Sequence, residues 1–329
     1  MIVAVVVPGG LTETLQAAPL LGSLLVSGET VILAASPEGA AIGAGLVGVE
    51  RVLSLSCLAD GATGGVVAAL LALRRQRLDA ALLCSTRQRD RVLAFAAGCA
   101  RRIGPAAGPL DILLTSRVAV DRSQNRAELW LRLGAEIGAH PEAAAPAFRS
   151  PEAERRTAEA LLIGGGFEDG RLLIGLAPGG GYGRGADGYS AADLRWDVER
   201  HAHLANQLAH RHGAGIVLLG GQEDRALTDE LLLDLEADHL DLVGQLSVSE
   251  AAAVVARCDL VVAADTPVLH MAAATGTPSI GVFGPTDGRR RGPWGPEQHV
   301  VQAVSGRSPV AGTHRLRVDD VLARIESSL

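Results

Sequence analysis

Short apolar runs alternate with longer amphipathic stretches along most of the chain. Residues 1–7 are an uninterrupted apolar run, which predicts a buried strand, and residues 11–25 follow as a helix that Pro19 interrupts or kinks. The same alternation predicts further strands at 31–35, 52–54, 80–84, 172–177, 216–219, 240–243, 260–264 and 279–283, and helices at 64–75, 91–100, 198–211, 223–235, 248–256, 268–275 and 318–327. Strands that alternate with helices predict doubly wound parallel sheets in an α/β protein.

Composition divides the chain into two parts. Residues 138–151 are rich in alanine and proline and show no clear periodicity, which is typical of an interdomain linker. A length of 329 residues is enough for two domains, each with its own core. We therefore expect Rossmann-like domains at 1–150 and 151–316, followed by a final helix within 317–329.

Composition also excludes several classes of protein. Hydrophobic residues make up 48% of the chain and charged residues 20%, and no apolar run reaches the roughly 18 residues of a membrane span. No basic segment precedes residues 1–7, so we expect a first strand in a cytoplasmic protein rather than a signal peptide. A net charge of −7 gives no broad basic footprint for nucleic acid. All 30 basic residues are arginine, so phosphate binding must fall to arginine, backbone or hydroxyl groups.

Cysteine and histidine spacing predicts no metal site. The four cysteines are scattered, which favours buried thiols in a reducing compartment: Cys57, Cys84, Cys99 and Cys258. The pairs His201-x-His203 and His210-x-His212 fall on one expected helix, where residues two apart diverge by about 200°.

The stretch 258–287 has the clearest organisation. Its apolar strand is followed at once by Asp265, Thr266 and Pro267; either polar residue can cap a helix, and the proline presets φ at the first helical position. The helix N-terminus then opens at the carboxyl end of a parallel strand, where N–H groups and the helix dipole attract an anion. An ordinary capped helix is the alternative.

This stretch resembles the signature of glycosyltransferase family 9, the lipopolysaccharide heptosyltransferases and their relatives. The family pattern is Asp-Ser/Thr-Gly, then His with Ala-Ala-Ala, then Gly-x-Pro and Phe-Gly-Pro-Thr. The chain has Asp265-Thr266-Pro267, His270, Ala272-Ala273-Ala274, Gly276-Thr277-Pro278 and Phe283-Gly284-Pro285-Thr286, with Pro267 in place of the glycine. The resemblance implies a GT-B architecture, in which two Rossmann-like domains face each other across a cleft and the last helix packs back on the N-terminal domain.

The resemblance implies a donor site in the C-terminal domain. Asp265, Thr266 and Pro267 would hold a diphosphate, although proline offers no N–H, and His270 would face the same site or serve as a buried structural histidine. It further implies donor contacts from Gly180, Gly181 and Arg184 in a glycine-rich loop, from Arg195 beside Leu194, which replaces the family's lysine, from Glu223 at the nucleotide ribose and from Gly244 beside the nucleobase. Loop flexibility would explain the glycines as well, and a favourable interaction with a helix dipole would explain Glu223.

The resemblance implies an acceptor site in the N-terminal domain. The family's glycine-rich loop is matched by residues 9–15, where Thr12 and Glu13 take the positions of a Gly-Asp pair. Gly10, Thr12 and Arg87 would then contact the acceptor, and Glu13 would act as general base. The alternative is a capping pair at a helix start for Thr12 and Glu13, and a solvated surface position for Arg87.

The resemblance therefore implies an inverting glycosyltransferase. It would move a sugar from a nucleotide-diphosphate donor such as ADP-heptose to a hydroxyl of a glycolipid or small metabolite, without a metal or a further cofactor. A glycolipid acceptor would bring it to the inner face of the membrane as a peripheral protein. Because Thr12, Leu194 and Pro267 depart from the family pattern, a non-catalytic GT-B protein that binds a nucleotide sugar is the alternative. A nicotinamide-dependent dehydrogenase is disfavoured, since no G-x-G-x-x-G follows the first strand.

Overall fold

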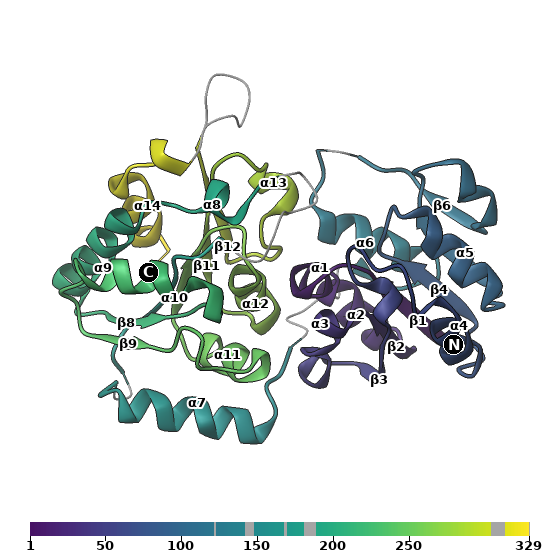
Figure 1. Ribbon diagram of the computed structural model, residues 1–329, viewed down its shortest axis with the longest axis horizontal. Helices are drawn as coiled ribbons and strands as arrows, with labels where there is room; N and C mark the ends of the chain where they lie inside the picture. The colour runs from purple at the N-terminus through teal and green to yellow at the C-terminus, as the bar shows by residue number, and fades with distance from the viewer. Residues whose placement is uncertain (122, 142–147, 168–169, 181–188, 304–312, 329) are drawn as a thin grey trace. The chain divides into compact units, whose positions relative to one another are not determined.

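A computed structural model of the protein describes residues 1–329 except 122, 142–147, 168–169, 181–188, 304–312 and 329 (Figure 1). The chain divides into two compact units, Met1–Arg149 and Ser150–Leu329, and this division falls one residue from the expected boundary at 150. Each unit is built around one six-stranded parallel sheet.

The N-terminal unit has the strand order β3-β2-β1-β4-β5-β6. Its strands are β1 (Ile2–Val7), β2 (Thr30–Ala35), β3 (Val49–Ser54), β4 (Ala80–Leu83), β5 (Arg101–Pro105) and β6 (Ser116–Val118). Its helices are α1 (Leu11–Gln16), α2 (Ala18–Val26), α3 (Pro37–Ala40), α4 (Val66–Arg74), α5 (Gln88–Ala96) and α6 (Arg126–Ala135), with 3₁₀ turns η1 (Gly43–Gly45), η2 (Ser56–Leu58) and η3 (Pro109–Leu113). β1 is central and almost fully buried, which explains why its sequence is continuously apolar rather than alternating.

The C-terminal unit has the strand order β12-β11-β10-β7-β8-β9. Its strands are β7 (Leu173–Ala177), β8 (Gly215–Leu218), β9 (His239–Asp241), β10 (Leu260–Ala263), β11 (Ser279–Phe283) and β12 (Gln298–Gln302). Its helices are α7 (Glu152–Gly164), α8 (Ala191–Leu194), α9 (Val198–His212), α10 (Arg225–Leu232), α11 (Val248–Val255), α12 (Pro267–Thr275), α13 (Gly288–Arg291) and α14 (Val318–Glu326), with 3₁₀ turns η5 (Gln222–Asp224) and η6 (Thr313–Arg315).

The two sheets share one topology. Counted from the first strand of each unit, both have the order 3-2-1-4-5-6, and every pairing is parallel. The direction of winding reverses between β1 and β4 and between β7 and β10, and open α/β sheets bind ligands beyond the carboxyl ends of strands at such points. The predicted α/β architecture of two doubly wound, Rossmann-like domains is confirmed.

Several elements differ from the sequence prediction for local reasons. The helix expected at 11–25 is two helices that meet at Ala17, and Pro19 lies in the first turn of the second, where its missing N–H costs no helical hydrogen bond. β5 has the sequence RRIGP, and β12 has the sequence QHVVQ. The Gly-Pro pair of β5 and the polar residues at the ends of β12 resemble loop sequence, so neither strand was predicted.

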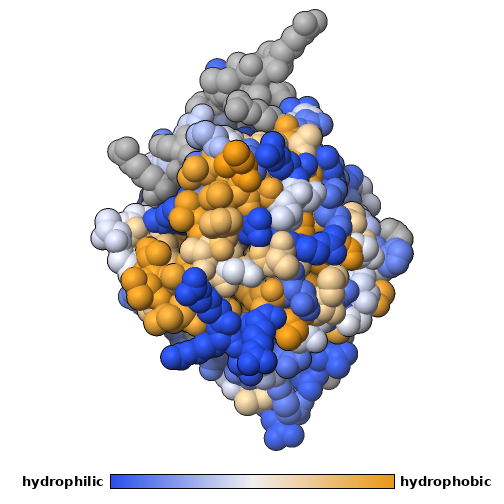
Figure 2. Space-filling model, turned by 90° about the vertical axis from the view of Figure 1, so that its right-hand side faces the viewer, coloured by the Kyte–Doolittle hydropathy of each residue, from blue (hydrophilic) through white to orange (hydrophobic). Residues whose placement is uncertain are grey.

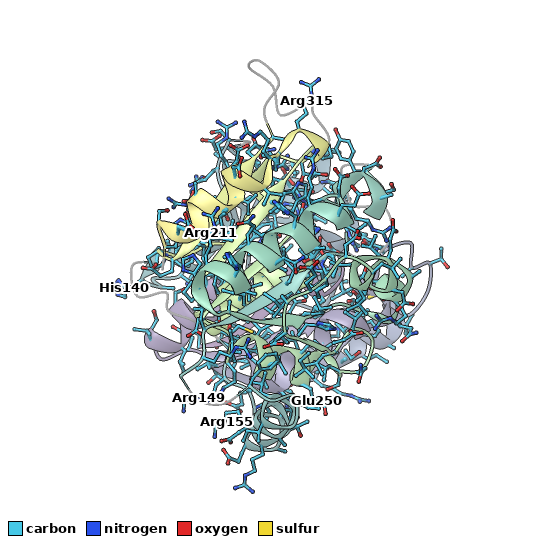
Figure 3. The ribbon with its side chains drawn as sticks, turned by 90° about the vertical axis from the view of Figure 1, so that its left-hand side faces the viewer. His140, Arg149, Arg155, Arg211, Glu250 and Arg315 are labelled. Atoms are coloured by element: carbon cyan, nitrogen blue, oxygen red, sulfur yellow. The ribbon has the colours of Figure 1, made fainter. Side chains whose placement is uncertain are left out.

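The last helix packs within its own unit. Val321, Leu322 and Ile325 are buried in the core of the C-terminal unit, where α14 contacts α9, β11 and β12. The two helices also meet at their surface, where Arg211 Nη1 lies 3.2 Å from Glu326 Oε1 (Figure 3). The apolar side of α14 is therefore buried in the core of its own unit, and the packing on the N-terminal domain that the resemblance implies stays a prediction.

The cysteines and the lengths of the helices can be compared with the expectations from composition. All four cysteines are free and buried, as the sequence predicted. None of the helices in the described ranges combines the length and the apolar character that crossing a membrane requires.

A buried histidine stands at the start of α9. His201 is 1% exposed and packs edge-to-face on Trp196, with ring centroids 5.0 Å apart, while Trp196 Nε1 donates to the Leu316 carbonyl at 3.1 Å. Burial lowers the pKa of His201 to about 4, and its hydrogen bond with the Asp197 carbonyl only partly opposes this. His201 is therefore neutral in the folded protein at neutral pH.

We expect this histidine to make folding sensitive to acid. Its pKa is about 4 when folded and about 6.5 when unfolded, so its contribution is fully present above pH 6.5 and is lost as pH falls through 4, by up to about 3 kcal/mol. His201→Phe keeps an aromatic contact with Trp196 and removes the titration. Urea unfolding followed by circular dichroism between these pH values should show a smaller loss of stability for the variant than for the wild type; equal losses would contradict the assignment.

Candidate functional site

The turn between β10 and α12 is held by a buried ion pair. Asp265 follows the strand with a side chain that is 1% exposed. Arg291, the last residue of α13, donates from Nε to Asp265 Oδ2 and from Nη2 to Oδ1, the latter at 3.5 Å. Because α13 follows β11, the pair joins the loops at the carboxyl ends of two neighbouring strands. The contribution of Asp265 to a donor site would be to position this turn.

His270 completes the buried cluster. It lies in α12, is 3% exposed, and has Nε2 at 3.9 Å from Asp265 Oδ1. Burial disfavours the Asp265 carboxylate, but the hydrogen bond with His270 and the charge of Arg291 outweigh burial and hold the pKa of Asp265 below its usual range. Of the two roles expected for His270, these contacts describe the structural one.

Two buried hydroxyl groups at this edge have no hydrogen-bond partner among the residues that the structure describes. They belong to Thr266, the N-cap residue of α12, and Thr286, between β11 and α13; the residues are 4% and 5% exposed. A buried polar group without a partner costs about 1–3 kcal/mol, so such groups mark positions that a ligand or water completes. Thr286 had no predicted role beyond its place in the motif. The sequence alone could not assign one, because only the fold shows that β10 and β11 are parallel neighbours whose carboxyl ends share an edge.

The N-terminus of α12 opens at the same edge. Pro267 occupies its first turn, so the N–H groups of Val268 and Leu269 are the first that the helix can offer to an anion. The helix runs for nine residues, which is long enough to present a dipole there. Hydroxyl groups, backbone N–H groups and a helix dipole thus lie together at the carboxyl ends of β10 and β11, next to the switch point between β7 and β10.

The loop after β8 supplies one buried and one exposed carboxylate. Asp224 is 4% exposed; its Oδ2 accepts from the Gly221 N–H at 3.2 Å, whereas Oδ1 has no partner among the described residues. Burial and the charge of Glu223 raise the pKa of Asp224, although the Gly221 hydrogen bond and the charge of Arg195 oppose them. Glu223 is exposed and its carboxylate folds over Gly221. Of the two acids, Glu223 is the one that is open to solvent.

The loop after β7 approaches these acids closely. Gly179 and Gly180 are buried, and a Cβ at Gly179 would lie 2.2 Å from Asp224 Oδ1, so only glycine fits there. The predicted donor residues Gly181 and Arg184 lie outside the described residues.

Arg195 and Leu194 face different surroundings. Leu194, at the position of the family's lysine, is 7% exposed and so has no access to a ligand. Arg195 is partly buried, and its Nε is without a partner in the described part of the chain. Its charge acts on Asp224, which places the guanidinium near the loop after β8. Arg195 is therefore a partly buried cation beside the loop after β8 with an Nε that no described residue accepts from.

Gly244 closes the loops beside β8 and β9. It has φ of +72°, donates its N–H to the Gly220 carbonyl at 3.1 Å, and would place a Cβ 2.4 Å from Gln222 Oε1. The left-handed conformation and this close approach both favour glycine. The predicted nucleobase-side residue thus lies beside the loop that carries Glu223.

In the N-terminal unit, Glu13 caps its own helix. Its Oε2 accepts from the Gly10 N–H at 3.0 Å, and Oε1 lies 3.9 Å from Arg126 Nη1. The side chain is still 32% exposed. The capping role that the sequence left open is confirmed, and one carboxylate oxygen stays near solvent beside a cation.

The other predicted acceptor residues gather around the same loop. Arg87 Nη1 and the Gly9 N–H both donate to the Leu58 carbonyl, each at 3.0 Å, and Arg87 also pairs with Asp60. Arg87 follows β4, the neighbour of β1, so both groups stand at the switch point of the N-terminal sheet. Gly10 and Thr12 are partly exposed at the start of α1.

No three His, Cys, Asp or Glu side chains come together as a metal site would require, within the part of the chain that the structure describes. The C-terminal arrangement relies instead on hydroxyl, backbone N–H and guanidinium groups, which suit a phosphate.

We expect Arg291→Ala to destabilise the protein by about 3 kcal/mol or more, because it leaves the Asp265 carboxylate buried without its cation. Arg289→Ala removes a neighbouring arginine whose side chain is 77% exposed, and should change stability little. Denaturant unfolding measures both. If Asp265→Asn fails to relieve the loss in the double variant, the pair is not its cause.

Comparison with known proteins gives matches in both sequence and fold. Residues 185–315 match the model of glycosyltransferase family 9 (heptosyltransferase). Lipopolysaccharide heptosyltransferase 2 of Salmonella typhimurium is 27% identical over 163 residues, which are 48% of this chain and 42% of that protein. The chain therefore spans less than half the length of this curated relative in the match.

Solved structures match along the whole chain. A glycosyl transferase family 9 protein from Veillonella parvula has a TM-score of 0.82 at 16% identity, covering 99% of this chain and 96% of its own. The E. coli ADP-heptose lps heptosyltransferase II has a TM-score of 0.77 at 19% identity, covering 100% and 98%. At these identities the likeness shows the fold, which is GT-B. The C-terminal unit thus resembles glycosyltransferase family 9 (heptosyltransferase) in sequence over residues 185–315, and the whole chain shares the GT-B fold of these structures.

Proposed function

We propose that the protein is an inverting glycosyltransferase that uses ADP-heptose as donor and a glycolipid or small-metabolite hydroxyl as acceptor. The donor is a substrate, and the proposal requires neither a metal nor a further cofactor. The C-terminal unit would bind the nucleotide sugar and the N-terminal unit the acceptor.

The unpartnered hydroxyls of Thr266 and Thr286 carry this proposal. They stand at the carboxyl ends of neighbouring strands beside the N-terminus of α12, where a diphosphate would complete their hydrogen bonds. As the bond from the sugar C1 to the diphosphate breaks, negative charge grows on the leaving group. Fixed hydroxyl and N–H donors, with Arg195, would stabilise that charge.

The choice of donor rests on the comparisons and on the loop after β8. The E. coli structure is named for ADP-heptose, and the Salmonella relative for lipopolysaccharide heptosyl transfer. In this chain the exposed Glu223 carboxylate can accept hydrogen bonds from ribose hydroxyls, with Gly244 beside it.

Glu13 is the proposed base. The acceptor oxygen would attack the sugar C1 from the face opposite the diphosphate while its proton passes to the Glu13 carboxylate. The Gly10 N–H fixes one carboxylate oxygen, and the other lies beside Arg126, so the group is held in position and kept near solvent. Gly10, Thr12 and Arg87 would line the acceptor side. A glycolipid acceptor would place the protein on the cytoplasmic face of a membrane.

A nucleotide-sugar-binding protein without catalysis is the second candidate. Glu13 already caps α1, Leu194 is buried where the family has a lysine, and Pro267 lacks an N–H. Leu194 and Pro267 lie at the donor site and would reduce the stabilisation of the leaving diphosphate, whereas the described hydroxyl and N–H groups could still bind a nucleotide sugar without transfer.

Thr286→Val should weaken ADP binding about tenfold or more, because a hydrogen bond to a charged group contributes about 1.5–3 kcal/mol. Valine keeps the shape of threonine, and the hydroxyl it removes has no described partner, so unfolding stability should not fall. Isothermal titration with ADP, with and without Mg²⁺, measures the first quantity and denaturant unfolding the second.

Thr277→Val is the matched control. Its hydroxyl donates to the Val255 carbonyl at 3.0 Å in the same unit, so its loss should lower stability and leave ADP affinity unchanged. If both variants bind ADP like the wild type, the diphosphate assignment is wrong. If UDP or GDP binds more tightly than ADP, the donor base is wrong.

Glu13→Gln should lower kcat for heptose transfer about 100-fold or more, since glutamine still accepts the Gly10 N–H but cannot take a proton. Glu38→Gln is the control, because Glu38 also faces the start of α1, accepting from the Leu11 N–H at 3.4 Å. Transfer from ADP-heptose to a lipopolysaccharide core acceptor is measured. Full activity of Glu13→Gln would rule out the base, and ADP binding without any transfer by the wild type would favour the second candidate.

A further inference from the structure

Two helices of the N-terminal unit expose apolar side chains on their outer faces. α4 buries Ala69 and Leu73 against the sheet, yet Val67 on its opposite side is 71% exposed and Leu71 is 48% exposed. α5 does the same, burying Leu93 and exposing Val92 and Phe95 at 45% and 54%. An outward face of this kind is unusual on a helix that already has a buried one.

The exposed side chains form one region. α4 and α5 pack against each other, and Arg74 Nε on α4 donates to the Ala96 carbonyl on α5 at 3.0 Å. η3 packs beside α5 and exposes 75% of Ile112. Figure 2 views the N-terminal unit from the side of these helices and shows apolar groups gathered in patches between polar ones. We call the outer faces of α4, α5 and η3 the α4–α5 surface.

Exposed large apolar side chains are concentrated on the α4–α5 surface. Twelve large apolar side chains are exposed among the described residues, and six of them lie on the α4–α5 surface: Val66, Val67, Leu71, Val92, Phe95 and Ile112. In the C-terminal unit the exposed ones are Ile163, Tyr189 and Leu233, on separate segments. Single exposed apolar residues are ordinary, whereas a cluster points to a partner.

The charge of this region opposes that of the rest of the chain. Residues 60–113, which include α4, α5 and η3, hold eight arginines and four aspartates, a net charge of +4, while all other residues together carry −11 of the total −7. Within this range Arg91 is buried and pairs with Asp111, and Arg87 pairs with Asp60, so the exposed arginines at the end of α4 carry the positive charge of the surface. Arg74, Arg75 and Arg77 are exposed at the end of α4. The local positive charge therefore favours an anionic partner that the rest of the molecule would repel.

The arginines and apolar side chains are interleaved. The Arg102 guanidinium lies over the Phe95 ring at 5.4 Å from its centroid. On α4, Val67 and Leu71 are one turn apart, and Arg74 and Arg75 follow in the next turn on the same outer side. Apolar residues flanked by arginine match the boundary of a bilayer, where apolar groups enter between lipids and guanidinium groups meet phosphates.

We propose that the α4–α5 surface docks on an anionic phospholipid membrane. The apolar side chains of both helices would enter the headgroup region, and Arg74, Arg75 and Arg77 would bind lipid phosphates. This binding goes beyond the proposed function and does not depend on catalysis, since no residue of the candidate donor site takes part in it. The protein would then lie on the same membrane surface as a lipid-anchored acceptor.

Co-sedimentation with vesicles tests the proposal. The full chain should bind phosphatidylglycerol–phosphatidylethanolamine vesicles, bind phosphatidylcholine vesicles far more weakly, and lose affinity as salt is raised. Arg75→Glu/Arg77→Glu should weaken binding by about 25-fold or more, because each arginine near an anionic surface contributes about fivefold. Val67→Ser should weaken it about fivefold through lost apolar contact.

Matched controls lie on the other unit. Arg155→Glu/Arg156→Glu makes the same charge change on two exposed arginines of α7, where Arg155 is seen at the surface (Figure 3), and Leu233→Ser removes an 84% exposed apolar side chain. Neither control should change vesicle binding, and circular dichroism with denaturant unfolding of all variants checks that the fold is kept. Equal binding to both vesicle types, equal loss in variants and controls, or self-association in place of vesicle binding would overturn the proposal. A failure of heptose transfer would leave vesicle binding unaffected, so the two proposals are tested separately.

Discussion

The buried pair of Asp265 and Arg291 is the interaction on which the C-terminal arrangement depends. It joins the turn after β10 to the segment after β11, and His270 supports it from within α12. A charge this deeply buried is tolerated only when its partner is fixed, so the pair constrains both loops at once. The same contacts keep Asp265 charged, and they explain how a residue of the motif can position a turn through buried contacts alone.

The polar atoms left unpartnered beside that pair distinguish a binding surface from a packing surface. Thr277 follows α12, and its hydroxyl donates a hydrogen bond to the Val255 carbonyl, which is a structural role. Thr266 and Thr286 have no such described partner, although they are equally buried. The folded protein therefore holds these hydroxyls at a cost in stability, which a bound diphosphate would relieve. If a diphosphate binds there, the free energy that these hydroxyls cost the folded protein would contribute to its affinity.

The two units share one topology and divide the chemistry between them. The C-terminal unit carries the hydroxyl groups, the helix N-terminus and the acid–arginine group of the loop after β8. The N-terminal unit carries a carboxylate at the start of α1 and, on α4 and α5, a basic face with exposed apolar side chains. Equal strand order thus fixes where loops converge, whereas the residues in those loops decide what each unit can bind.

The sequence by itself determined the fold class, the two sheets and the motif at Asp265–Thr286, because short buried strands and helix starts leave strong local patterns. It could not identify β5, β6 or β12, whose polar or Gly-Pro residues take strand geometry only from a neighbouring strand. Which helix packs on which core was decided by the tertiary structure, as α14 shows. The tertiary structure also decided that Arg291 pairs with Asp265 and that the Thr286 hydroxyl has no described partner. The reason is that hydrogen bonding between residues far apart along the chain depends on how the strands are ordered in space.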